Sequence, residues 1–274
     1  MNFVHLEFDG VIATMTLDHP GGNRINFQMR EEILHTVERV AASDARVLLV
    51  KGKGPDFCLG GDIRDWPGIP AKDLRPRVEV FARAIDLLEG LAIPTIAVVQ
   101  GGCMGGGFEL ALGCDLVIAA KSARFMFPEA LLGIMTLQGG VYQLAERIGR
   151  AKALELVLLS EPTGAEQMAA WNVVNRVVDD ASLDEAAHAL AARLVLGPPD
   201  AYARTKALMQ IWRDRGRAEA RQQLYDMSMP LFDTPDVQSA LRNAVDAVSA
   251  GLPIPKAHFP ASRRVSEHDR KGRA

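Results

Sequence analysis

The stretch from Gln100 to Asp115, QGGCMGGGFELALGCD, limits the folds open to this chain more than any other part of the sequence. Five glycines fall within its residues 101–107. Each ordered glycine costs roughly 0.5–1 kcal/mol of backbone entropy relative to alanine in regular structure. A run of them therefore predicts a place where the main chain passes very close to another group. A single acid, Glu109, follows among apolar residues, and its position needs a reason of its own.

Composition excludes several classes of protein. With 274 residues, 48% of them hydrophobic, the chain can bury a large core in one or two domains. A net charge of −3 does not favour nucleic acid or an anionic membrane as a partner. No apolar run approaches the roughly 18 residues of a membrane span, and the N-terminal MNFVHLEFDG does not resemble a signal peptide. We expect a soluble, cytoplasmic protein that binds neither nucleic acid nor membrane.

Cysteine and histidine usage argues against a disulfide framework and against a metal site. The three cysteines are an odd number, they lack paired CxxC spacing, and the six histidines are scattered. This usage is typical of a reducing compartment. We expect no bound metal.

The order of the predicted elements favours an α/β fold. Short apolar strands alternate with amphipathic helices, which is typical of α/β proteins. Asn26 is the expected N-cap of the first helix. The predicted elements are a hairpin over 4–17, helices over 28–43 and 78–92, strands over 46–52, 94–100, 115–120 and 122–127, helices over 141–149, 150–160 and 164–171, and a strand over 172–179.

Pro198-Pro199 marks the expected domain boundary. We expect a core domain over 1–197 and a C-terminal helical region over 198–258, with a break near MPLFDTPD. The segment 259–274 has no periodicity and a basic excess, so we expect a flexible, solvated tail.

The glycine run does not match the common phosphate or nucleophile motifs. A dinucleotide fingerprint would need a third glycine at position 110, which is leucine, and neither a Walker A string nor a GxSxG elbow occurs. What remains is a strand, a glycine turn and a helix that begins near Gly106. Main-chain N–H groups at a helix start have no internal partner, and glycine lets a substrate oxygen approach them. The pattern indicates an oxyanion site with Glu109 one turn away.

Four segments together resemble the crotonase superfamily of enoyl-CoA hydratases and isomerases. GGCMGGGFELALGCDLVIAA matches its main signature, FCLGGDI over 57–63 its first oxyanion loop, FPEALLG over 127–133 its second acid segment, and NRIN over 23–26 an early motif more loosely. The resemblance covers about residues 4–255. It implies a spiral of ββα units followed by a C-terminal helical region that forms trimers.

The resemblance also implies a reaction and its residues. In relatives, two main-chain N–H groups bind the thioester oxygen of an acyl-CoA, and they correspond to Gly61 and Gly106. Two glutamates that act on the acyl chain correspond to Glu109 and Glu129. Burial and mutual repulsion would raise both pKa values, so one carboxyl could activate water while the other delivers a proton. Without the glycines, Glu109 could be a surface residue, and Glu129 could be a cap or an ion-pair partner.

Further residues around these loops are expected to contact the substrate or its CoA arm. Apolar neighbours suggest a hydrophobic acyl pocket, although Met and Phe are also ordinary core residues. Asp62 could instead brace its loop, Cys58 could be a packing residue, and Trp66 could do either. The predicted substrate-binding residues are Cys58, Gly60, Asp62, Ile63, Trp66, Gly105 and Leu137, and the predicted pocket neighbours are Met104, Phe125, Met135 and Leu137.

The chain departs from the hydratase pattern after its second acid. Thr136 replaces the customary proline, and Leu137 replaces a glycine whose backbone places the catalytic water in hydratases. Arg24 stands where alanine is usual. We therefore expect an enoyl-CoA hydratase, with double-bond isomerisation, C–C cleavage and decarboxylation as alternatives. A non-catalytic scaffold is disfavoured because both glutamates are kept. The resemblance implies a homotrimer or a dimer of trimers, an acyl-CoA substrate and no separate cofactor.

Overall fold

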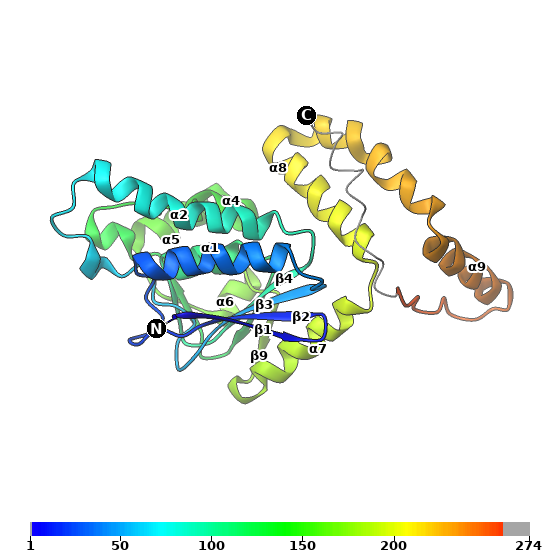
Figure 1. Ribbon diagram of the computed structural model, residues 1–274, viewed down its shortest axis with the longest axis horizontal. Coiled ribbons are helices and arrows are strands. Elements are labelled where there is room, and N and C mark those ends of the chain that lie inside the picture. The colour runs from blue at the N-terminus through cyan, green and yellow to red at the C-terminus, as the bar shows by residue number, and fades with distance from the viewer. Residues whose placement is uncertain (1, 260–274) are drawn as a thin grey trace. The chain divides into compact units, whose positions relative to one another are not determined.

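The computed structural model describes residues 2–259 (Figure 1). Of the expected tail over 259–274, only Phe259 lies within the described residues. The chain divides into two compact units, of which the first ends at Ala192 and the second begins at Arg193. The expected boundary after residue 197 lies a few residues later. No helix of the described chain is long and apolar enough to cross a membrane.

A six-stranded, mostly parallel sheet forms the centre of the first unit. Its first two strands make the predicted antiparallel hairpin around Gly10, whose φ of 57° favours glycine. Each later strand joins in parallel, and the third to fifth strands are almost wholly buried. In spatial order the strands are β1 (Val4–Asp9), β2 (Ile12–Leu17), β3 (Val47–Gly52), β4 (Thr95–Val99), β6 (Leu116–Ala120) and β9 (Arg176–Val178).

Helices α1 (Phe27–Ala41) and α2 (Ala71–Glu89) pack side by side over this sheet (Figure 1). Asn26 caps α1 as predicted, because its Oδ1 accepts a hydrogen bond from the Met29 N–H at 2.8 Å. Helix α2 begins seven residues earlier than predicted. Pro76 lies inside it, in the second turn, and it has no N–H to donate to the preceding turn, so the helix lacks one main-chain hydrogen bond there.

A second, three-stranded sheet holds the glycine run in place. It consists of β5 (Gly102–Met104), β7 (Arg124–Met126) and β8 (Thr163–Gly164). The sequence predicted a plain turn where β5 lies, and the difference arises because Gly101, at φ 54°, turns the chain out of β4 into a new strand. Helix α3 (Gly106–Leu112) then begins at the predicted residue.

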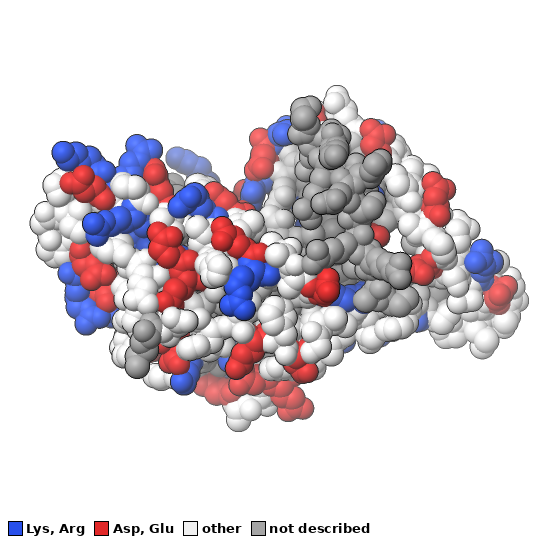
Figure 2. All heavy atoms as spheres, in the orientation of Figure 1, with Lys and Arg blue, Asp and Glu red and all other residues white. Residues whose placement is uncertain are grey.

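The remaining helices of the first unit follow the predicted order. They are α4 (Gly140–Ile148), α5 (Arg150–Leu159), α6 (Ala165–Ala170) and α7 (Leu183–Val195), whose last three residues lie past the end of the unit at Ala192. Short 3-10 turns occur at η1 (Ile63–Asp65), η2 (Glu129–Leu132) and η3 (Asp180–Ser182). On the face of this unit shown in Figure 2, basic and acidic side chains are interspersed.

The second unit is helical, as predicted. Helix α8 (Pro199–Ser228) is interrupted at Gly216, whose φ of 83° is not helical. The predicted break appears as a 3-10 turn, η4 (Met229–Asp233), followed by α9 (Pro235–Ser249). No residue of α9 is buried, and Val245 and Val248 are more than 60% exposed. An amphipathic helix with its apolar side uncovered is consistent with the expected oligomer, which stays a prediction.

Candidate active site

The loop over 57–63 and the glycine run are joined through their main chains. Cys58 and Cys103 form a β-bridge, with the Cys58 N–H donating to the Gly102 carbonyl at 3.0 Å and the Met104 N–H to the Cys58 carbonyl at 2.9 Å. A Cβ on Gly107 would lie 2.4 Å from the Cys58 carbonyl oxygen, far inside contact distance. This close approach explains why the sequence needs glycine there.

The two predicted oxyanion donors lie on the same cavity. A Cβ on Gly106 would lie 3.8 Å from the Gly61 nitrogen, so the two glycines are neighbours. Gly106 is the first residue of α3, where the helix itself leaves N–H groups free. Within the described chain, no protein acceptor bonds to the N–H of either glycine. Two free donors on one wall suit an oxygen that gains negative charge.

Glu109 is a buried acid held by main-chain donors. Its side chain is 1% exposed, and its Oε1 accepts hydrogen bonds from the Gln138 N–H at 2.8 Å and the Gly140 N–H at 2.9 Å. Burial raises the pKa of Glu109 to about 7, against the lowering effect of these two donors, while the nearby Glu129 raises it further. The carboxyl is therefore poised to exchange protons near neutral pH.

Glu129 reaches the same cavity from η2. Its Oε1 lies 2.7 Å from the point where a Cβ on Gly105 would sit, and the φ of 49° at Gly105 also favours glycine. Its Oε2 is buried and has no hydrogen-bond partner in the described chain. Burial raises the pKa of this carboxyl above its usual value. An unpartnered buried oxygen of this kind is available to a ligand or to water.

The cavity between these groups has a volume of about 250 Å³ and mostly apolar walls. Nine of the eleven predicted site residues line it, all except Cys58 and Asp62. Of the four predicted pocket neighbours only Leu137 does. Phe125 is completely buried in the core and Met135 is 67% exposed, so the expectation that they and Met104 border the pocket was wrong.

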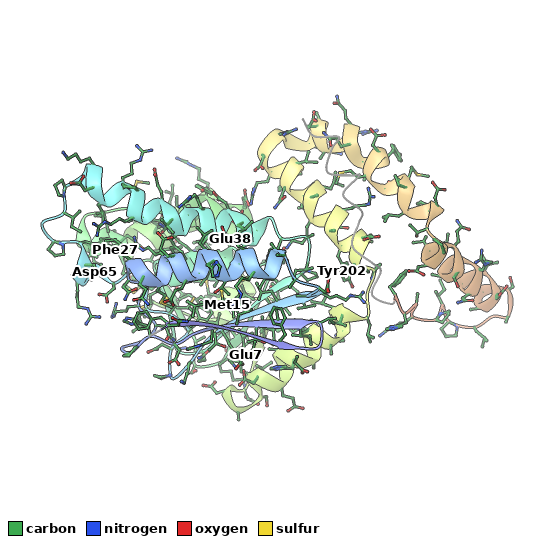
Figure 3. All side chains as sticks on the ribbon, in the orientation of Figure 1. Glu7, Met15, Phe27, Glu38, Asp65 and Tyr202 are labelled. Atoms are coloured by element: carbon green, nitrogen blue, oxygen red, sulfur yellow. The ribbon has the colours of Figure 1, made fainter. Side chains whose placement is uncertain are left out.

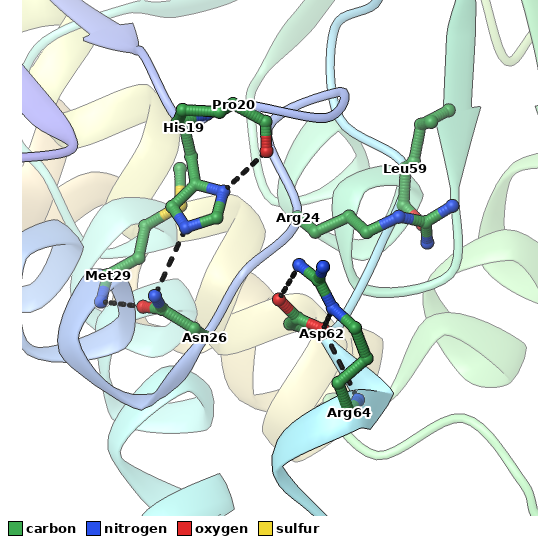
Figure 4. Close-up of polar contacts among 8 residues, drawn as sticks. All are labelled: His19, Pro20, Arg24, Asn26, Met29, Leu59, Asp62 and Arg64. Carbon is green, nitrogen blue, oxygen red and sulfur yellow. Dashed lines mark hydrogen bonds and ion pairs between the residues drawn. The ribbon is translucent and has the colours of Figure 1, made fainter.

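Cys58 and Asp62 support the loop and do not face the cavity. The Cys58 Sγ is buried and donates to the Asn23 carbonyl at 3.0 Å, and burial raises the pKa of this thiol to about 12, so it stays uncharged. Asp62 caps η1 through the Arg64 N–H and pairs with the Arg64 guanidinium at 2.6 Å (Figure 4). That hydrogen-bonded pair lowers the pKa of the Asp62 carboxyl. The alternative that Asp62 braces its loop is therefore the one observed.

The sequence reasoning missed several residues that line the cavity. Arg24 was noted only as a departure, yet it borders the cavity and its Nη1 donates to the Leu59 carbonyl at 3.2 Å (Figure 4). Arg30 and Phe81 reach the cavity from α1 and α2. No motif marks them, because only the packing of the two helices decides which faces look inward. The other unpredicted lining residues are Ile25, Leu59, Pro128, Leu131, Leu132, Ile134 and Gln138.

Comparison with known proteins identifies the family to which this sequence is similar. The family profile described as enoyl-CoA hydratase/isomerase matches residues 7–247. A 1,2-epoxyphenylacetyl-CoA isomerase of Escherichia coli K12 is 37% identical over 204 residues, covering 72% of this chain and 78% of that protein. A carnitinyl-CoA dehydratase of Salmonella typhimurium LT2 is 37% identical over 215 residues, covering 77% and 80%.

Solved structures agree with the sequence comparison. The structure of an enoyl-CoA hydratase subunit from Geobacillus kaustophilus HTA426 superposes with a TM-score of 0.84 at 30% identity, covering 95% of this chain and 98% of that chain. The crotonase resemblance and the mixed α/β fold with a C-terminal helical region are thereby confirmed. The chain belongs to the enoyl-CoA hydratase/isomerase family of the crotonase superfamily.

Proposed function

We propose that this protein adds water in syn fashion to a 2-enoyl-CoA, or removes it in the reverse direction. The observation that carries the proposal is a pair of carboxyls, the buried Glu109 and the half-buried Glu129, on the same cavity as two unpartnered main-chain N–H groups. A family that processes CoA thioesters supplies the substrate class. The relative named as a dehydratase supports elimination or addition of water as the reaction.

In the proposed mechanism, the thioester oxygen accepts hydrogen bonds from the N–H groups of Gly61 and Gly106. Attack at C3 of the enoyl group sends charge onto this oxygen as an enolate, so donors that are already in place lower the barrier. Loss of one such donor typically costs about 2.7–4 kcal/mol in activation free energy. The apolar walls keep other water away from the enolate and strengthen this effect.

The environments of the two acids suggest distinct roles. Glu109 receives two main-chain hydrogen bonds that favour its ionised form, so it is the proposed base that removes a proton from water as the oxygen bonds to C3. Glu129 has a raised pKa and a buried Oε2 without a partner, so it is the proposed acid that delivers a proton to C2. One water is consumed, and proton exchange between the two carboxyls restores the starting state.

The test is hydration of a short 2-enoyl-CoA, followed as loss of the conjugated thioester absorbance. Glu109→Gln and Glu129→Gln should each lower kcat by roughly 10²–10⁴-fold, the usual contribution of a positioned acid or base. Binding of a saturated acyl-CoA, measured by calorimetry, should survive both changes. Glu31→Gln, on the exposed side of α1, is the control. A double variant that hydrates at the wild-type rate would refute the proposal.

Double-bond isomerisation is the second candidate, because Leu137 lines the cavity where hydratases carry glycine. A leucine side chain that crowds out water would favour proton transfer between carbons. Incubation with a 3-enoyl-CoA and mass spectrometry of the products separates the two reactions. The same product analysis, run on CoA thioesters that carry a 3-keto group or a carboxylate on C2, detects C–C cleavage or decarboxylation, which would pass through the same enolate.

We also propose that the chain assembles as a homotrimer or a dimer of trimers, with no cofactor beyond the CoA of the substrate. The uncovered apolar residues of α9 support self-association. Light scattering at micromolar concentration tests it, and a monomer would count against it. The cytoplasmic location stays a prediction.

A further inference from the structure

Arg30 is a buried cation on the wall of the active-site cavity. It lies on α1 one turn after Phe27 (labelled in Figure 3), and only 3% of its surface is exposed. Its guanidinium stacks on the rings of Phe27 and Trp66, 5.2 and 5.6 Å from their centroids. Nη1 donates to the Arg77 carbonyl oxygen at 3.3 Å, whereas Nε is buried and has no partner.

No carboxylate neutralises this charge within the described chain. Arg30 takes part in no ion pair there, and Asp65 acts on it only from beyond ion-pair distance. Burial lowers the pKa of Arg30 to about 10, so the side chain still carries its charge at neutral pH. The two aromatic contacts and the hydrogen bond to the Arg77 carbonyl compensate part of the cost of burying this charge, but no anion balances it.

A second unpartnered donor lies beside it. The Trp66 Nε1–H is buried and has no acceptor in the described chain, and the indole lines the same cavity. A Cβ on Gly61 would lie 3.1 Å from Trp66 Cζ2 and 3.6 Å from Arg30 Nη2. Both side chains therefore border the part of the wall that holds the Gly61 oxyanion donor, close to where the first carbons of an acyl group would lie.

We infer that Arg30 and Trp66 together recognise a carboxylate on the acyl group, so that the substrate is the CoA monothioester of a short dicarboxylic acid. A planar guanidinium can bind a carboxylate with two parallel hydrogen bonds, and the indole N–H supplies a third donor. A bound anion would satisfy both orphaned donors and neutralise the charge. The inference rests on the proposed acyl-CoA function and adds the chemistry of the acyl group to it.

The test measures binding of saturated ligands, which the enzyme cannot turn over. Glutaryl-CoA carries the distal carboxylate, and valeryl-CoA has the same number of acyl carbons without it. By calorimetry the wild type should bind glutaryl-CoA at least about tenfold more tightly, the effect of a single charge-assisted hydrogen bond. Arg30→Met should abolish this preference, Arg30→Lys should retain part of it, and Trp66→Phe should reduce it while keeping the ring.

Arg77→Met is the matched control. Arg77 also stacks on Phe27, at 4.9 Å, but it is exposed and does not line the cavity, so this variant should keep the preference. Equal wild-type affinities would overturn the inference even if Arg30→Met failed to fold. An equal loss of both ligands in Arg30→Met would also overturn it, because the cation would then bind a CoA phosphate. If the wild type prefers glutaryl-CoA over valeryl-CoA but hydrates no 2-enoyl-CoA, this inference stands and the proposed reaction is refuted.

Discussion

Replacement of Glu109 by glutamine should stabilise the protein, and the gain should grow with pH. Folding raises the pKa of this carboxyl from 4.5 to about 7, so the folded chain holds the proton more tightly than the unfolded chain does. The stability that the neutral carboxyl gives is complete below about pH 4.5 and is lost as pH rises through about 7. At roughly 1.36 kcal/mol per pKa unit, the full loss is about 3 kcal/mol.

Glutamine avoids this loss because it never ionises. Its Oε1 can still accept from the Gln138 and Gly140 N–H groups that now bond to Glu109. The variant should therefore be similar to the wild type at pH 5 and more stable by about 2–3 kcal/mol at pH 8, from the same conversion of pKa to free energy.

The assay is urea unfolding at pH 5, 6, 7 and 8, followed by circular dichroism at one fixed protein concentration. The free energy of unfolding of the variant minus that of the wild type should rise with pH and level off above about 7.5. For Glu31→Gln, on the exposed side of α1, the same difference should stay flat. A flat line for Glu109→Gln, or a gain that shrinks as pH rises, would refute the assignment of a buried acid with a raised pKa.

Three further predictions follow from the same geometry. Gly106→Ala should lower kcat by roughly 10²-fold, because its Cβ would lie 3.2 Å from Phe81 and crowd the donor wall; a steady-state assay with an unchanged rate would contradict this. The hydration kcat/KM should rise with pH through an apparent pKa near 7 as Glu109 ionises, and a pH–rate profile that is flat between 6 and 8 would remove Glu109 as the base. Asn26→Ala should cost about 1 kcal/mol of stability through loss of the cap on the Met29 N–H, which chemical denaturation measures.

Local patterns predicted the parts of the fold that local forces decide. The hairpin, the cap of α1 and the start of α3 each depend on residues within a few positions of one another, and each was confirmed. The short strand β5 was missed because three residues in a glycine-rich stretch carry no strand pattern. Its partners, Cys58 and β7, are distant in sequence.

The candidate site also contains residues that local motifs predict and residues that only tertiary packing brings to the cavity. Glycines and acids in characteristic strings identified the donors and the two carboxyls, which line one cavity. Arg30 was invisible, because a charged residue on an amphipathic helix normally faces solvent. It is buried here since α2 packs against that side of α1 and Trp66 covers it. Phe125 shows the opposite error, because an apolar residue next to a signature can belong to the core as easily as to a pocket.

The β-bridge between Cys58 and Cys103 separates the placement of the oxyanion donors from the choice of acyl group. Peptide geometry and main-chain hydrogen bonds set the spacing of the Gly61 and Gly106 N–H groups that would bind the thioester oxygen, and side chains contribute little to it. Other parts of the cavity wall are formed by side chains on α1, α2 and η2. Mutations in this wall can therefore change which acyl group fits without moving the two N–H donors. Related proteins with this fold can acquire new acyl specificities while the oxyanion site stays the same.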